Sequence, residues 1–82
     1  PPGNKSKCNS NWGWLSVSLP NRWNQAKIWI DNNYAGNKQA RQQVIAGSHT
    51  VYVQYYGSSG FSYDETTRGY VPACGYWSIV SN

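Results

Sequence analysis

The chain has 82 residues, a formal net charge of +4 and a hydrophobic content of 39%. A chain of this length forms one small domain, in which apolar burial only narrowly offsets the conformational entropy lost on folding. We therefore expect a covalent cross-link. Its seven Lys and Arg residues are scattered singly. A surface that follows a phosphate backbone gathers such residues in a patch, so the charge does not favour nucleic acid as a partner.

The chain opens on PPGNKSK, which has the composition of a linker, and we predict a linker remnant over residues 1–7 and a single domain over residues 8–82. The two cysteines, Cys8 and Cys74, lie near opposite ends of the chain. A disulfide between them would stabilise the fold by roughly 4 kcal/mol on the loop-entropy model. Two cysteines are too few for a four-ligand zinc site, so we favour a structural disulfide over free or metal-bound thiols. We therefore expect a secreted, extracellular protein.

The segment NSNWGWLSVSLP alternates in character. Successive side chains of an extended strand point to opposite faces. One face is aliphatic, with Leu15, Val17 and Leu19, and the other carries Trp12 and Trp14 between serines. The aliphatic face is typical of a core, so the two indoles need either a covering element or a ligand.

The segment AKIWID repeats this alternation. In the loop that precedes it, Trp23 could either cover the core or form a wall of a binding site. The run Asp31-Asn32-Asn33 then predicts a turn, because Asn and Asp tolerate positive φ. The apolar face of the second strand carries Ala26, Ile28 and Ile30, and its other face carries Lys27, Trp29 and Asp31.

The middle of the chain predicts an edge strand over residues 41–46 and a hairpin turn at Ala46-Gly47-Ser48. The turn leads into HTVYVQYY, a third strand with exposed aromatic residues. Its inward face carries Val51, Val53 and Tyr55, and its outward face carries Thr50, Tyr52, Gln54 and Tyr56.

The remaining stretch is rich in loop residues, with short strands predicted over residues 61–63 and 69–71. The segment YWSIVSN predicts a last strand with Trp77 and Ile79 pointing inward. The fold class we predict is all-β: a small antiparallel β-sandwich, or a flattened barrel, with two sheets, five to seven short strands and one disulfide.

The chain offers little catalytic chemistry. Asp64 and Glu65 are adjacent, so on a strand they face opposite ways and suit no paired-carboxylate mechanism. We therefore expect a protein that is not an enzyme and that has no cofactor. A structural calcium at Asp64 or Glu65 is only a minor alternative, because the sequence has no calcium-loop spacing.

The strongest signal is an aromatic content of 16%, with five Trp and seven Tyr. If the three alternating strands share a sheet, their outward rings tile one platform, and a large exposed apolar patch is typical of a binding site. We predict stacking by Trp14 and Trp29, extended by Trp12, Tyr52 or Tyr56. The predicted hydroxyl-binding partners on the same faces are Gln54, Asp31 and Lys27.

A small Trp- and Tyr-rich, disulfide-closed β domain that begins in a linker resembles the carbohydrate-binding modules appended to secreted cellulases and other glycoside hydrolases. The resemblance implies a β-glucan ligand such as cellulose or a cello-oligosaccharide, and an attached catalytic domain. A fainter resemblance, through AKIWIDNNYAG and VIAGSHTVYV, is to small β domains of bacterial surface proteins.

Two other functions stay open. A single-stranded nucleic-acid binder also combines aromatic residues with positive charge, and its affinity would fall steeply with salt. A structural or protein-contact domain would bind no sugar, and a partner would cover its outward indoles.

No membrane segment is visible in the sequence, and we expect neither a membrane nor a nucleic-acid partner.

Overall fold

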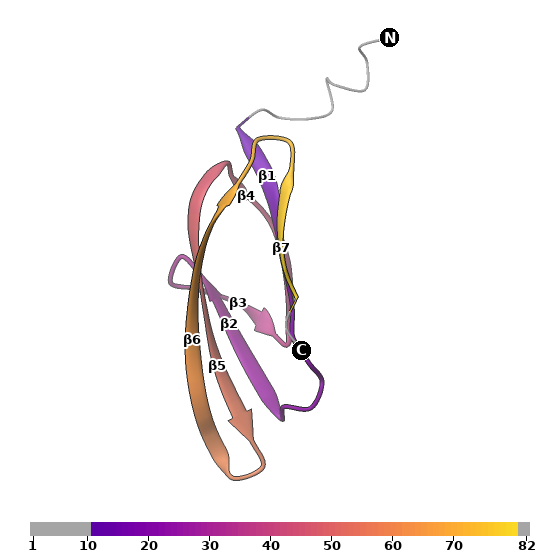
Figure 1. Ribbon diagram of the computed structural model, residues 1–82, viewed down its shortest axis with the longest axis vertical. Coiled ribbons are helices and arrows are strands. Elements are labelled where there is room, and N and C mark those ends of the chain that lie inside the picture. Colours follow the sequence, from indigo (N-terminus) through magenta and orange to yellow (C-terminus); the bar gives the residue numbers. More distant parts are fainter. Residues whose placement is uncertain (1–10, 81–82) are drawn as a thin grey trace.

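The structure, a computed structural model, describes residues 11–80, in which seven β-strands form two sheets (Figure 1). The smaller sheet has the strand order β4-β1-β7 and the larger has the order β3-β2-β5-β6. This confirms the predicted all-β, two-sheet fold. Within the described part of the chain there is no membrane-spanning helix. The strands are β1 (Trp12–Ser18), β2 (Gln25–Ile30), β3 (Asn33–Asn37), β4 (Gln39–Ile45), β5 (Gly47–Gly57), β6 (Gly60–Val71) and β7 (Tyr76–Val80).

The core lies between the two sheets and is made by the aliphatic faces that the alternation predicted. Burying a large aliphatic side chain contributes about 1.5–3 kcal/mol to folding stability. The aliphatic residues therefore decide which face of each strand packs against the core. Trp77 and Ile79 of β7 pack against the core, as predicted. The buried residues are Leu15, Val17, Leu19, Ala26, Ile28, Ile30, Ala40, Val44, Val51, Val53, Tyr55 and Val71.

The predicted turn after β2 is a tight hairpin that leads into β3. Asp31 and Asn32 have φ angles of 50° and 70°, as a two-residue turn with positive φ at both positions requires. The side-chain Nδ2 of Asn33 donates a hydrogen bond of 3.2 Å to the Asp31 backbone carbonyl. The strand β3 itself was not predicted, because the letters NYAGN have no alternation and contain turn-forming residues.

The predicted hairpin at Ala46-Gly47-Ser48 is wrong. β4 pairs with β1, whereas β5 pairs with β2 and β6, so the chain changes sheet at this point. Gly47 has a φ of 138°, which a residue with a side chain rarely adopts, and this glycine lets the chain turn from one sheet to the other.

Two further details differ from the prediction, and one is not tested. The two short strands predicted around residues 61–63 and 69–71 are parts of one long strand, β6. The smaller sheet is mixed, because β7 runs parallel to β1. The predicted disulfide involves Cys8, which lies outside the described residues, so its bond to Cys74 stays a prediction.

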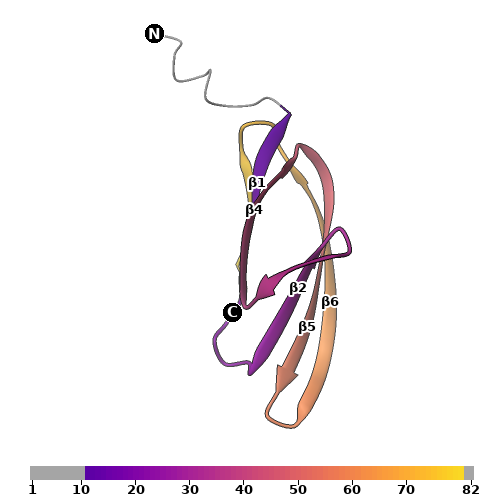
Figure 2. The same ribbon diagram turned by 180° about the vertical axis from the view of Figure 1, so that it is seen from behind.

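The β5–β6 hairpin extends beyond the end of the smaller sheet (Figures 1 and 2). Trp23, from the loop between β1 and β2, packs against the core and covers this extension. Its ring centroid lies 5.1 Å from that of Tyr55 and 5.6 Å from that of Tyr63. Tyr55 and Tyr63 stack at 4.7 Å. Trp23 therefore covers the core, the first of the two roles that the sequence left open.

Candidate functional site

The outward aromatic residues lie on two opposite faces of the sandwich. Trp12 and Trp14 belong to β1 in the smaller sheet, whereas Trp29 and Tyr52 belong to β2 and β5 in the larger one. The inner faces of these strands share one core, so their outer faces point away from each other. The predicted single platform that joins Trp14 to Trp29 is therefore wrong, because the strands do not share a sheet.

The outer face of the larger sheet carries what we call the aromatic strip: Tyr34, Trp29, Tyr52, Tyr56 and Phe61. The ring centroid of Trp29 lies 5.6 Å from those of both Tyr34 and Tyr52. The rings of Tyr56 and Phe61 are 5.8 Å apart. Tyr52 and Tyr56 are four residues apart on β5, so the two clusters lie roughly 13 Å apart along the strand.

A row of polar side chains crosses the sheet between the two aromatic clusters. Lys27 of β2 pairs with Gln54 of β5, which pairs with Asp64 of β6. The hydroxyl of Tyr56 donates to Gln54 Oε1 at 2.9 Å, and Gln54 Nε2 donates to the Tyr52 hydroxyl at 3.0 Å. The Tyr52 hydroxyl donates in turn to Asp64 Oδ2 at 2.8 Å. This chain of hydrogen bonds holds both tyrosine rings in place before any ligand arrives, which lowers the ordering cost of binding.

Two charged side chains, Lys27 and Asp64, contact tyrosines of the aromatic strip. The Nζ atom of Lys27 lies over the Tyr56 ring, 5.0 Å from its centroid. The hydrogen bond from Gln54 alone would lower the pKa of Tyr52, but donation to the Asp64 carboxylate and its negative charge raise that pKa above its usual value. Tyr52 therefore remains a neutral hydroxyl at physiological pH.

Asp31, a predicted ligand-binding residue, lies in the β2–β3 turn and is occupied by structural contacts. Its Oδ1 accepts a hydrogen bond from the Thr50 amide at 3.0 Å. Its Oδ2 lies 2.5 Å from His49 Nδ1, and the other ring nitrogen of His49 lies 2.5 Å from the Ile45 carbonyl oxygen. A neutral imidazole can donate only one of these two bonds, whereas the protonated form donates both.

This contact predicts a pH-dependent stability. Burial alone would lower the pKa of His49, but the Ile45 carbonyl and Asp31 raise it above 6.5. The stabilisation is therefore complete below pH 6.5 and is lost as the pH rises through the pKa of the folded state. Asp31 is 44% exposed, so solvent screening limits the loss to about 1 kcal/mol. We expect the free energy of unfolding in urea to fall by this amount at alkaline pH, and His49→Gln to remove the pH dependence.

His49 is the single histidine of the chain, so an equal fall in the free energy of unfolding with rising pH in the His49→Gln variant would contradict this assignment.

The contribution of Asp31 to stability has the opposite pH dependence. Burial alone would raise the pKa of its carboxyl, but the hydrogen bonds from Thr50 and His49 and the charge of His49 lower it below 3.8. Its contribution is present above pH 3.8 and is lost as the pH falls through the folded-state pKa.

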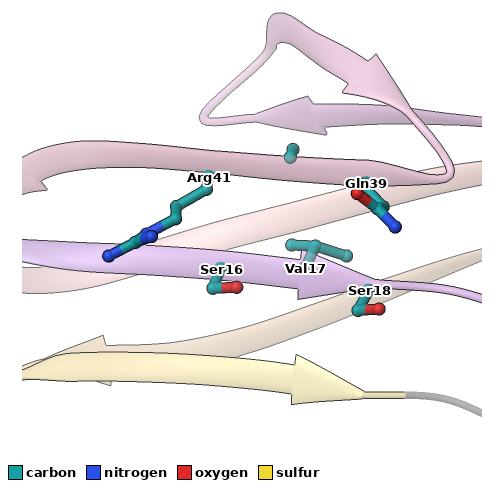
Figure 3. A pocket seen from close by; sticks show the side chains of 6 residues that line it. Ser16, Val17, Ser18, Gln39 and Arg41 are labelled. Atoms are coloured by element: carbon teal, nitrogen blue, oxygen red, sulfur yellow. The ribbon is translucent and has the colours of Figure 1, made fainter.

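The outer face of the smaller sheet has a different character. Trp14 is 42% exposed and faces Tyr76 across the β1–β7 pair. Arg41 of β4 lies beside Ser16 and contributes to two shallow hollows of about 240 and 440 Å³. Figure 3 shows the larger one, between β4 and β1. Trp12 is half-buried and lies at the end of this sheet, in a separate hollow beside Ile45.

Two residues of the aromatic strip, Tyr34 and Phe61, were not predicted from the sequence. Tyr34 pairs with Trp29 because the Asp31-Asn32 turn is only two residues long. Assuming that turn length would have placed a residue of β3 next to Trp29. Phe61 faces Tyr56 at an irregularity in the β5–β6 pairing, and no sequence pattern indicates it.

Among residues 11–80, no three His, Cys, Asp or Glu side chains come close enough to hold a metal ion. Asp64 accepts its hydrogen bond from Tyr52 on the outer face, whereas Glu65 accepts one from Tyr55 at 3.3 Å on the inner face. The prediction that these carboxylates face opposite ways is confirmed. They do not form a paired site.

The described residues therefore offer two outward surfaces with exposed aromatic rings, one on each sheet. Comparison of the chain with protein-family models, with curated proteins and with solved structures gave no match.

Proposed function

We propose that the protein is a non-catalytic carbohydrate-binding module whose aromatic strip binds a neutral β-glucan chain. The observation that supports this most is the strip itself, a line of two ring clusters with a polar row between them. Aromatic faces and neutral hydrogen-bonding groups together suit a ligand whose rings are apolar on their faces and hydroxylated at their edges.

The chemistry of an equatorially substituted glucan fits this arrangement. Its axial C–H bonds make each ring face apolar, so a ring can lie on Trp29, or on the exposed Phe61 beside Tyr56. Its equatorial hydroxyls then reach Lys27, Gln54 and Asp64 in the polar row. By analogy with nucleobases on aromatic side chains, each stacking contact contributes about 1–3 kcal/mol. After the cost of association, two such contacts give affinity in the micromolar range.

The orientation of the rings favours a single soluble glucan chain over a crystalline surface. The ring of Trp29 makes interplanar angles of 76° with Tyr34 and 50° with Tyr52, and Tyr56 and Phe61 meet at 74°. A flat crystal face can touch only rings that share a plane. A single chain can rotate about its linkages to meet each ring in turn. We therefore expect stronger binding to soluble cello-oligosaccharides than to microcrystalline cellulose.

Calorimetric titration with cello-oligosaccharides of increasing length tests this function. Because the two ring clusters are roughly 13 Å apart, affinity should rise with chain length until one ligand spans both clusters, and then level off. Stacking on neutral rings should also be nearly independent of salt. No heat with any soluble or mixed-linkage glucan would contradict the proposal and favour a protein-contact domain. A steep loss of affinity with salt would instead favour single-stranded nucleic acid.

The attachment of this domain to a secreted glycoside hydrolase is part of the same proposal. Its biological consequence would be to hold the catalytic domain close to soluble or exposed glucan chains. The predicted Cys8–Cys74 disulfide belongs with the secreted location. A mass shift of the intact protein on reduction and alkylation tests for that bond.

A further inference from the structure

We propose that the outer face of the smaller sheet carries a second binding site, which takes a carboxylate-bearing sugar ring of the uronate class. It lies on the opposite side of the sandwich from the aromatic strip. This inference does not depend on glucan binding at the strip, and the two can be tested separately.

The site is built by two residues on one row of the sheet and three residues on the neighbouring row. In the first row, Trp14 of β1 faces Tyr76 of β7. In the second row, Ser16 lies between Arg41 of β4 and Ser78 of β7. These five side chains line one hollow of about 240 Å³. Ser16 and Arg41 also line the larger hollow shown in Figure 3, so the two hollows adjoin.

The charge of this face is uncompensated. Arg41 is the single charged residue among the outward positions of β1, β4 and β7 that the structure describes. The three acidic residues of the chain all lie elsewhere, in the β2–β3 turn or on β6. Arg41 therefore presents a positive charge that no acidic side chain of the protein neutralises, and it favours an anionic ligand.

The position of Arg41 also leaves its hydrogen-bond donors available. Its Cζ atom lies over the Trp14 ring, 4.9 Å from the ring centroid. A guanidinium held against an aromatic face keeps the N–H groups at its edge free, in the fork geometry that matches a carboxylate. The contact with Trp14 also holds the side chain in position before binding, which reduces the entropy lost on binding.

The remaining residues select a sugar ring rather than a bare anion. Tyr76 is 70% exposed and offers a ring face on which a pyranose can stack. Ser16 and Ser78 also line the hollow, and each hydroxyl can donate to or accept from a sugar hydroxyl. An apolar ring face, hydroxyl groups and one carboxylate together describe a uronate.

A matched pair of ligands tests the proposal. The β-1,4-linked tetramer of glucuronate differs from cellotetraose only in its C6 carboxylates, and both are titrated into the full chain by calorimetry. We expect Arg41→Gln to weaken the glucuronate tetramer about tenfold and to leave cellotetraose unchanged. Tyr76→Ala should have the same selective effect. Circular dichroism of each variant verifies that the fold is retained.

The matched control is Arg68→Gln, which removes the same charge from an exposed position on β6 of the larger sheet. It should leave glucuronate binding unchanged. Equal losses in Arg41→Gln and Arg68→Gln would show attraction to net charge alone and would overturn the site. Unchanged glucuronate affinity in the Arg41→Gln variant would also overturn the site. So would sedimentation experiments that show a dimer of the wild-type protein and a monomer of the Trp14→Ala variant.

A third variant separates this inference from the proposed function. Trp29→Ala should lose cellotetraose binding and retain binding of the glucuronate tetramer. Absence of glucuronate binding in the wild-type protein, with cellotetraose binding intact, would overturn the second site alone. Absence of cellotetraose binding with glucuronate binding intact would contradict the glucan function alone.

Discussion

Replacing Trp29 by alanine is expected to weaken cellohexaose binding by about 10- to 100-fold without unfolding the protein. Trp29 lies at the centre of the larger aromatic cluster, between Tyr34 and Tyr52, so its loss removes a stacking surface and leaves its neighbours less well held. One stacking contact of about 1–3 kcal/mol corresponds to this loss of affinity. Its side chain points away from the core, so thermal stability should change little. Calorimetry with the variant measures the effect.

Trp14→Ala is the matched control, because the chain places a second partly exposed tryptophan on the opposite face. Trp14 lies in the smaller sheet, against Arg41. Each substitution removes one indole from an outward position of a strand. We expect Trp14→Ala to bind cellohexaose as the wild type does. A loss in Trp14→Ala with an unaffected Trp29→Ala would move the glucan site to the smaller sheet.

Replacing Gly13 by alanine is expected to destabilise the fold by about 2 kcal/mol and to lower the melting temperature by roughly 10 °C. Gly13 is buried in β1, between the two tryptophans and close to the connection from β6 to β7. A Cβ atom there would lie 2.5 Å from a Val71 methyl carbon, 2.6 Å from the Pro72 carbonyl oxygen and 3.0 Å from the Gly75 carbonyl oxygen. Two of these are backbone atoms, so the strand or the connection must shift.

Gly57→Ala is the control for this substitution. Gly57 ends β5, and a Cβ atom added to it would have no neighbour within 4 Å. We expect a change in the free energy of unfolding within about 0.5 kcal/mol. Thermal and urea unfolding of both variants measure the difference, and equal destabilisation by the two alanines would contradict the close contact at Gly13.

The sequence predicted well those features that depend on local alternation. The inward faces of β1, β2 and β5 follow from the separation of aliphatic and polar residues along each strand, and all three are confirmed. The turn at Asp31-Asn32 is also local, because it rests on the tolerance of these side chains for positive φ.

The assignment of strands to sheets could not be predicted in the same way. Alternation tells which side of a strand is buried, but it is the same whether two strands pair in one sheet or face each other across the core. For this reason Trp14 and Trp29 were predicted to share one platform. The backbone pairing of β1 with β4 and β7 instead separates them onto opposite faces.

The continuity of β6 between its two predicted ends was not predicted, for a different physical reason. It lies at the edge of the larger sheet, and most of its side chains are exposed, with Val71 as its one buried residue. A strand that buries neither face shows no alternation of apolar and polar residues. Consequently the sequence indicates at most a calcium-binding role for Asp64, and it does not reveal that this carboxylate accepts the hydrogen bond that orients Tyr52.

The measurement that tests the aromatic strip most directly is a two-dimensional proton–nitrogen NMR titration with cellohexaose that follows the five tryptophan indole N–H signals. The glucan proposal predicts that the Trp29 signal shifts in a saturable manner, while those of Trp14 and the core-packed Trp77 remain in place. Saturable shifts confined to Trp14, or no shift of any indole at saturating cellohexaose, would contradict the assignment of glucan binding to the aromatic strip.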